Sequence, residues 1–337
     1  MKQKDNPRVK CIQPEHKDDY EDLTVYHYTS PEAFRAIIQK KTLRFTDIRF
    51  LNDKSESTYF VQVLSDFLEE NEGGYPRLEN CFRRMLRGRD PSEISNIYDE
   101  NFMYETPRSD ILNQQPRCFV FSTCTEYDCL NMWNYYVYNH AYQGYNIGFE
   151  AGKLLDTFDG EDIEELSFMQ EGMVRYGRVV YDGAEQFKLL EAMAEGVENK
   201  LDWLAPYDHN TEESMVWKQW IVQREIDAYA AFFKHPAFKA ENEFRIAVVM
   251  NAQDVPMIPK HDRNSEEYRK EIVEAFTTKR GLMVPYLQIP LPADSIKGVT
   301  VAPIMEFELA RRGVSELMAA SGVEEVDIMQ SAVPIRF

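Results

Sequence analysis

The chain has 337 residues, 44% hydrophobic and 13% aromatic, with a formal net charge of -19 from 38 basic and 57 acidic side chains. This composition is typical of a folded globular protein, and the acidic balance argues against general binding to nucleic acid or to an anionic membrane surface. Because the five cysteines have no Cys-x-x-Cys spacing, the N-terminus lacks an apolar signal core and no apolar run is long enough to span a membrane, we expect a cytoplasmic protein with reduced thiols and, given its scattered histidines, no metal site.

The N-terminal third predicts a strand, a helix and a second strand behind a polar arm. Residues 1–21 are polar and charged, and we expect them to form an arm ahead of one domain at 22–337. A β-branched and aromatic run ending at Thr29 predicts a strand, and Ser30-Pro31 predicts the start of a helix that continues to Lys40. His27 then lies at the end of a strand that leads into a helix, where a side chain can face a cleft, although a lone histidine there is more often structural.

The middle of the chain alternates strands with helical segments. Asp53 and Glu56 have capping-box spacing, which predicts a helix start, and residues 69–117 form a charged insertion. A strand is expected over 118–123 and an aromatic-rich helix over 128–142, followed by strands over 145–150 and 174–181. Residues 182–231 predict a second, helical insertion. Toward the C-terminus we expect a polar helix over 263–278, strands over 282–287 and 296–301, a helix over 306–320 and a closing strand over 326–335.

The stretch from 232 to 250 carries the most chemistry. From Glu241 onward the residues alternate, which predicts a strand with one apolar face. On the other face Glu241 and Glu243 stand at i and i+2, with Cα atoms roughly 6.6 Å apart. Such a pair can act in catalysis, one carboxylate orienting a sugar hydroxyl and the other polarising a nucleophile. The alternative is an exposed strand face with a Glu243–Arg245 contact of little energetic value.

A series of short motifs runs through the chain in a fixed order. They are Tyr26-His27-Tyr28-Thr29, Asn52-Asp53 with Glu56, Cys118-Phe119 with Ser122, Met132-Trp133 with Tyr136, Glu241-x-Glu243-x-Arg245, and Ser331 with Pro334 and Arg336. In this order they resemble a bacterial domain-of-unknown-function family, family 2971, from about Thr24 to the end of the chain. Two departures are the longer strand produced by Val120-Phe121 and Tyr135 in a place where histidine is common.

That family in turn resembles the ADP-ribosyltransferase fold superfamily. The resemblance implies an α+β domain built on a split, mainly antiparallel sheet with an NAD-binding cleft, and with helical insertions at 69–117 and 182–231. It implies that His27 holds the adenosine ribose with Tyr28 and Thr29 beside it. It also implies that Ser122 or Tyr136 lines the nicotinamide pocket, that Trp133 stacks there, and that Glu243 is catalytic with Glu241 beside it.

The implied function is an NAD-consuming ADP-ribosyltransferase or NAD glycohydrolase, acting on an unidentified acceptor macromolecule or on water, without a metal. A bacterial toxin or an antiphage defence effector is the implied biological setting. The alternative is a non-catalytic module that binds a nucleotide or peptide on the same fold. A glycosidase is disfavoured, because no second pair of spaced carboxylates with flanking aromatic residues is evident.

Overall fold

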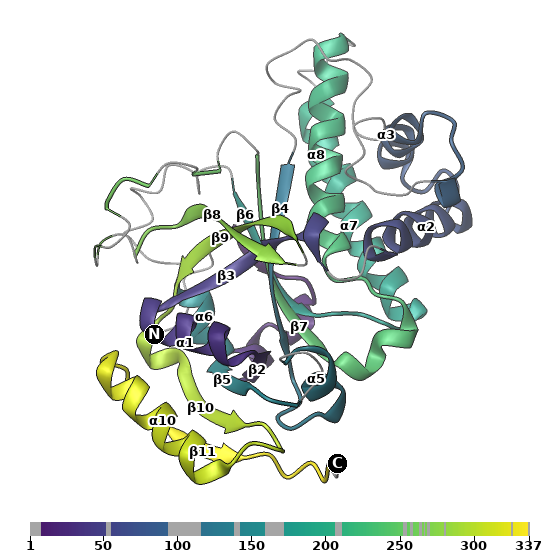
Figure 1. The fold of residues 1–337 in the computed structure, drawn as a ribbon. Helices are drawn as coiled ribbons and strands as arrows, with labels where there is room; N and C mark the ends of the chain where they lie inside the picture. The colour runs from purple at the N-terminus through teal and green to yellow at the C-terminus, as the bar shows by residue number, and fades with distance from the viewer. Residues whose placement is uncertain are drawn as a thin grey trace.

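Strand β4 (Pro116–Cys124) is the branch point of the sheet in this protein. The computed structural model describes residues 8–51, 55–93, 116–137, 142–158, 172–205, 211–251, 255–256, 259–262, 265, 267, 270–279, 281–324 and 326–335. These residues have a mixed α+β fold, in which the strands form one curled, mostly antiparallel sheet with helices on both faces (Figure 1). The expected α+β class is confirmed.

The main path of the sheet runs β1-β6-β7-β4-β2-β5-β10-β11. Its other strands are β1 (Val9–Cys11), β6 (Met173–Arg178), β7 (Glu243–Asn251), β2 (Thr24–Thr29), β5 (Tyr145–Glu150), β10 (Ile296–Val301) and β11 (Asp327–Gln330). A side branch leaves β4 through β3 (Thr42–Asp47) and β9 (Leu282–Pro290) to β8 (Val273–Lys279). Among these strands, β1 is parallel to β6 and β10 to β11, and the other neighbours pair antiparallel.

The sheet forks along one edge of β4. Strand β7 pairs with β4 over its whole length, from Pro116 to Cys124, and so occupies one edge. The other edge is shared: β3 pairs with β4 at Phe119 and Val120, whereas β2 pairs with it at Cys124. A strand has only two edges, so β2 and β3 must diverge between these contacts. The backbone of residues 121–123 therefore lies in the opening of a fork.

Helices cover both faces of the sheet because side chains alternate along the central strands. One face packs against α2 (Ser55–Glu70), α3 (Pro76–Leu86), α7 (Gly183–Leu204) and α8 (Glu212–Ala230), whose apolar residues form one core with Val120 and Ala247. The other face packs against α1 (Pro31–Lys40), α6 (Ala151–Asp156) and α10 (Phe307–Ala320), in a core that contains Phe121 and Ile246. The short helix α5 (Leu130–Tyr135) lies beside β2 and contributes to a third, smaller core (Figure 1).

Local sequence signals located several of these elements. Strand β2 and helix α1 occur where they were predicted, and the Ser30 hydroxyl accepts a hydrogen bond from the Ala33 amide at 3.2 Å as the N-cap. The helical insertion expected at 182–231 is the pair α7 and α8. The proposed capping residue Asp53 lies outside the described residues.

Three expectations differ from the structure. The N-terminal segment supplies β1, and Ile12 and Tyr20 are buried, so residues from Val9 onward pack into the fold instead of forming a polar arm. The aromatic helix expected over 128–142 begins at Leu130, and α5 ends at Tyr135. Asp128 lies outside it and accepts hydrogen bonds from the Trp133 indole and the Ser331 hydroxyl. The segment expected to be helical up to residue 278 contains strand β8, which pairs with β9 along its whole length.

Gly144 gives a direct test of packing next to β2. A Cβ atom at this position would lie 2.4 Å from the Thr29 carbonyl oxygen. Gly144→Ala should therefore lower the free energy of unfolding by about 1 to 3 kcal/mol, as overpacking against rigid backbone does. Gly196→Ala, within α7 where a Cβ meets nothing within 4 Å, is the matched control and should stabilise by about 0.5 to 1 kcal/mol. Equal effects in chemical denaturation would contradict this packing.

Candidate functional site

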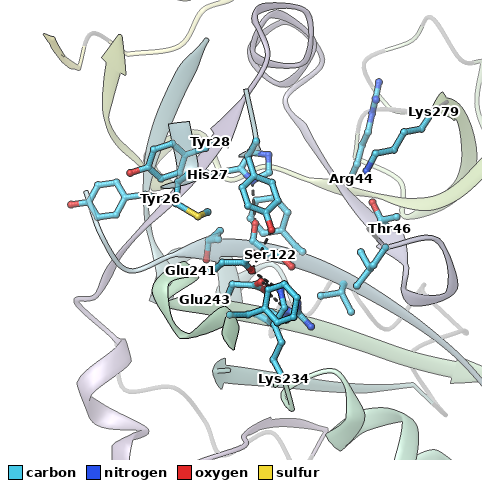
Figure 2. Close-up of a pocket in the computed structure, with 18 residues that line it drawn as sticks. Tyr26, His27, Tyr28, Arg44, Thr46, Ser122, Lys234, Glu241, Glu243 and Lys279 are labelled. Carbon is cyan, nitrogen blue, oxygen red and sulfur yellow. Dashed lines mark hydrogen bonds and ion pairs between the residues drawn. The ribbon is translucent and has the colours of Figure 1, made fainter. Parts of the chain in front are cut away.

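A cavity of about 410 Å³ occupies the fork of the sheet. Side chains from β2, β3, β4 and β7 line it, together with residues from α5 and from the segment between α8 and β7 (Figure 2). Of the predicted site residues, six line the cavity: His27, Tyr28, Ser122, Tyr136, Glu241 and Glu243. The structure therefore brings together residues separated by more than two hundred positions in the sequence.

Glu243 is held as a buried anion at the start of β7. Its side chain is 3% exposed, and both carboxylate oxygens contact cations. Oε1 accepts a hydrogen bond from Lys234 Nζ at 2.7 Å, and Oε2 accepts one from Arg245 Nε at 2.5 Å. Arg245 is itself anchored, since its guanidinium donates to the Ala231 carbonyl just beyond the end of α8. The exposed strand face that was the alternative interpretation is therefore wrong, because Glu243 and Arg245 are both buried.

Glu241 reaches the same wall of the cavity from outside the strand. It is the last residue of the short 3-10 helix η9 (Pro236–Glu241), and Asn242, with φ of 43°, turns the chain before β7 begins at Glu243. The prediction that both glutamates lie on one strand is therefore wrong. Their side chains still converge, because Lys234 Nζ also contacts Glu241 Oε2 at 2.5 Å. The Tyr136 hydroxyl donates to the same oxygen at 3.4 Å.

The pKa values of the two carboxylates are shifted in opposite directions. Burial works to raise the pKa of both, but the cations Arg245 and Lys234 outweigh burial at Glu243 and hold its pKa well below the usual range. Burial and the neighbouring Glu243 carboxylate raise the pKa of Glu241 to about 7, with Lys234 opposing the rise. The wall therefore combines a permanent anion with a group that exchanges a proton near neutral pH.

His27 on β2 and Ser122 on β4 also line the cavity. The Ser122 carbonyl accepts a hydrogen bond from His27 Nδ1 at 3.1 Å. Because a carbonyl oxygen can only accept, the proton is on Nδ1, and Nε2 is the acceptor nitrogen of the neutral ring. Burial lowers the pKa of His27, which keeps the imidazole neutral at pH 7. A neutral His27 can accept a hydrogen bond from a ligand hydroxyl.

The remaining predicted residues divide between cavity and core. Tyr28 lines the cavity, while its hydroxyl donates to the Glu126 carbonyl at 2.9 Å. Trp133 is fully buried behind Tyr28, with ring centroids 4.8 Å apart, and it does not line the cavity. Thr29 is also buried outside the cavity lining. The stacking role expected of Trp133 therefore has no support in its position.

Three cationic residues of the cavity had not been singled out from the sequence. Lys234 lies between the two glutamates, and Arg44 and Lys279 lie at the other end of the cavity (Figure 2). The sequence signal for Lys234 was its position directly after Phe232-Phe233, a pair that is buried in the structure. A lysine next to such a pair is rarely buried unless it has charged partners. Arg44 on β3 and Lys279 on β8 belong to strands of the side branch that β9 separates. An Arg44 guanidinium nitrogen lies 3.5 Å from the Thr277 hydroxyl, two residues before Lys279.

Comparison with known proteins supports a family but not an activity. Residues 132–246 match the family model described as Protein of unknown function (DUF2971). The match includes the Met132-Trp133 and Glu241-x-Glu243-x-Arg245 motifs, and so supports the resemblance to that family. No curated protein and no solved structure matches the chain.

Two general features of the described residues bear on the kind of site. No helix among them combines the length and apolarity that crossing a bilayer requires. No group of three or more His, Cys, Asp or Glu side chains in the same residues is arranged to hold a metal ion.

The raised pKa of Glu241 predicts a pH-dependent stability. Since folding raises this pKa from 4.5 to about 7, the stabilising contribution is complete below pH 4.5 and is lost as the pH rises through 7. Glu241→Gln removes this loss, so the variant should gain stability relative to the wild type between pH 4.5 and 7, with a slope approaching about 1.4 kcal/mol per pH unit. Urea unfolding of both proteins across this range measures it, and parallel stability curves would contradict the assignment.

Proposed function

We propose that the chain has an ADP-ribosyltransferase-like fold and cleaves the nicotinamide–ribose bond of NAD, transferring ADP-ribose to an acceptor macromolecule or to water. The observation that carries the proposal is the pair Glu241 and Glu243, two converging carboxylates with opposite pKa shifts on one wall of a cavity. Adjacent titratable groups whose environments push their pKa values apart are suited to divided roles in catalysis. The forked sheet supports the proposed fold, because the cavity lies in the split.

The roles follow from the charge states. Cleavage of the nicotinamide–ribose bond leaves its electron pair on the ring nitrogen of nicotinamide and develops positive charge on the ribose. Ionised Glu243 accepts a hydrogen bond from a ribose hydroxyl and stabilises that charge. Glu241 takes the proton of the attacking acceptor or water as the new bond to the ribose carbon forms. Its pKa of about 7 suits a general base at neutral pH.

The far end of the cavity suits the diphosphate of NAD. Arg44 and Lys279 provide positive charge there, in a chain whose formal net charge is -19. Neutral His27, which also lines the cavity, suits a ribose hydroxyl. A cytoplasmic setting is part of the proposal, and it is compatible with free thiols at all five cysteines.

One observation favours the alternative function, a non-catalytic nucleotide- or peptide-binding module. Both oxygens of Glu243 already contact cations, Lys234 and Arg245, and these cations reduce the field that the carboxylate exerts on a bound sugar. Under this alternative the protein binds NAD or ADP-ribose and is stabilised by it, but releases no nicotinamide.

The first experiment follows nicotinamide release and protein mass when the pure protein is incubated with NAD, alone and with cell extract. The wild type should release nicotinamide, and Glu243→Gln should slow release by at least ~10²-fold because it removes the anion that stabilises the transition state. Glu274→Gln is the matched control, a buried glutamate paired with Arg117 at 2.7 Å outside the cavity, and it should keep the wild-type rate. Thermal unfolding of both variants checks the fold.

Release by the wild type alone would establish NAD chemistry, and the change in protein or extract mass would then point to the acceptor. Thermal stabilisation by NAD without release would support the binding module. The absence of both effects in the wild type would overturn the proposal.

The cationic end of the cavity makes a separate prediction for binding. Arg44→Ala should weaken ADP-ribose binding by about tenfold or more, since a hydrogen bond to a charged group contributes about 1.5 to 3 kcal/mol. Arg77→Ala is the control, because Arg77 on α3 pairs with Glu198 and Asp202 on α7, away from the cavity. Calorimetry at two salt concentrations measures both variants. An unchanged affinity in Arg44→Ala would exclude Arg44 from the phosphate contact.

A further inference from the structure

Lys234 is delivered to the cavity by a fixed stretch of backbone after α8. Its amide donates to the Val180 carbonyl at 3.2 Å, and its own carbonyl accepts from the Gln186 side chain at 3.1 Å. The preceding residue, Phe233, forms an isolated parallel bridge with Val180. The end of the helical insertion is therefore attached to the chain that connects β6 to α7, and the Lys234 side chain starts from a defined point.

The ammonium group of Lys234 is the element shared by the two carboxylates. The side chain is 4% exposed, and its nitrogen lies 2.5 Å from Glu241 Oε2 and 2.7 Å from Glu243 Oε1. It also lies 4.9 Å from the centre of the Phe238 ring. A buried lysine is costly unless it is paired, and here it is paired twice.

The two carboxylates share this cation unequally. Glu243 has a second cation in Arg245, and its side chain is 3% exposed. Glu241 has Lys234 and the more distant Tyr136 hydroxyl, and 11% of its side chain remains exposed. Both glutamates line the cavity, but Glu241 is less compensated and more accessible. Lys234 is therefore the cation on which the charge of Glu241 chiefly depends.

We infer that Lys234 is the positioning residue of the carboxylate pair: its ammonium group holds Glu241 and Glu243 on one wall, where the second cation, Arg245, makes Glu243 the fixed anion and leaves Glu241 as the group that exchanges a proton. The inference deepens the proposed function and rests on it for the meaning of these roles. The arrangement itself is testable without NAD. With Lys234 and Arg245 present, two carboxylates and two cations balance at the wall.

Other groups face the pair and remain in every variant used below. The charged and titratable neighbours are Arg245 on β7, Tyr136 after α5, Tyr181 after β6, whose hydroxyl lies 3.2 Å from the Glu243 amide nitrogen, and Cys124 on β4. Any change that follows substitution of Lys234 is therefore measured against a constant surrounding.

The experiment is a carboxyl carbon NMR titration of the full chain labelled with ¹³C at glutamate side chains. Glu241→Gln identifies the Glu241 signal by its loss. In the wild type this signal should titrate with a midpoint of about 7. In Lys234→Met the midpoint should rise by about 1 to 3 units, since removal of a cation at this distance disfavours the carboxylate. Lys234→Arg, which keeps the charge, should leave the midpoint close to that of the wild type.

Two titration results would overturn the inference. One is an unchanged Glu241 midpoint in Lys234→Met. The other is an equal shift in Lys234→Met and Lys234→Arg, which would make the effect one of packing instead of charge. Neither depends on NAD cleavage, so the inference fails separately from the proposed function.

A second variant covers the case in which Lys234→Met folds but is too unstable for the titration. The double variant Lys234→Met/Glu241→Gln removes one cation and one carboxylate, and leaves Glu243 paired with Arg245. It should recover most of the melting temperature that Lys234→Met loses. A double variant that unfolds at the same temperature as Lys234→Met would show that Lys234 does not act through Glu241, and would overturn the inference.

Discussion

The cluster of Lys234, Glu241, Glu243 and Arg245 is the constraint on which the site depends. Four charged side chains that leave water together must be paired with good geometry, because a single unpaired member would cost several kcal/mol. This requirement fixes the end of α8, the 3-10 helix η9 and the first residues of strand β7 relative to one another. The helical insertion at 182–231 therefore does more than cover the sheet. Its last residue, Ala231, anchors Arg245 through its carbonyl, and Lys234 follows three residues later in the chain.

The fork in the sheet creates the space that this cluster faces. Strands β2 and β3 share one edge of β4, so part of that edge carries no ladder partner. An unpaired backbone group in a buried place is costly, and the His27 ring fills the gap by donating to the Ser122 carbonyl. The same hydrogen bond fixes the tautomer and turns Nε2 into an acceptor. The structural and the binding interpretations of His27 are therefore compatible, because one contact serves both.

Local signals in the sequence predicted the positions of helices and strands better than the tertiary contacts that they make. Ser30-Pro31 marked the start of α1, and the spacing of Glu241 and Glu243 identified the wall of the cavity. The αL conformation of Asn242, which takes Glu241 off the strand, has no local signal beyond asparagine itself. Strand β8 was mistaken for a helix because its stability comes from pairing with β9, a contact that polar composition does not announce. Trp133 was placed in the pocket on its chemistry, but its burial against Tyr28 is a tertiary property.

The distribution of charge along the cavity favours one orientation of a bound ligand. At the wall of the glutamates, two carboxylates and the cations Lys234 and Arg245 cancel, so this end favours neutral hydroxyl groups over free ions. At the other end Arg44 and Lys279 add positive charge with the acidic surface of the whole chain around them. An anionic ligand with a neutral polyhydroxyl part can satisfy both ends in one orientation only. That asymmetry arises from the residues themselves. In the proposed ligand, NAD, the diphosphate lies between two riboses, so the diphosphate can lie at the cationic end while one ribose lies at the glutamates.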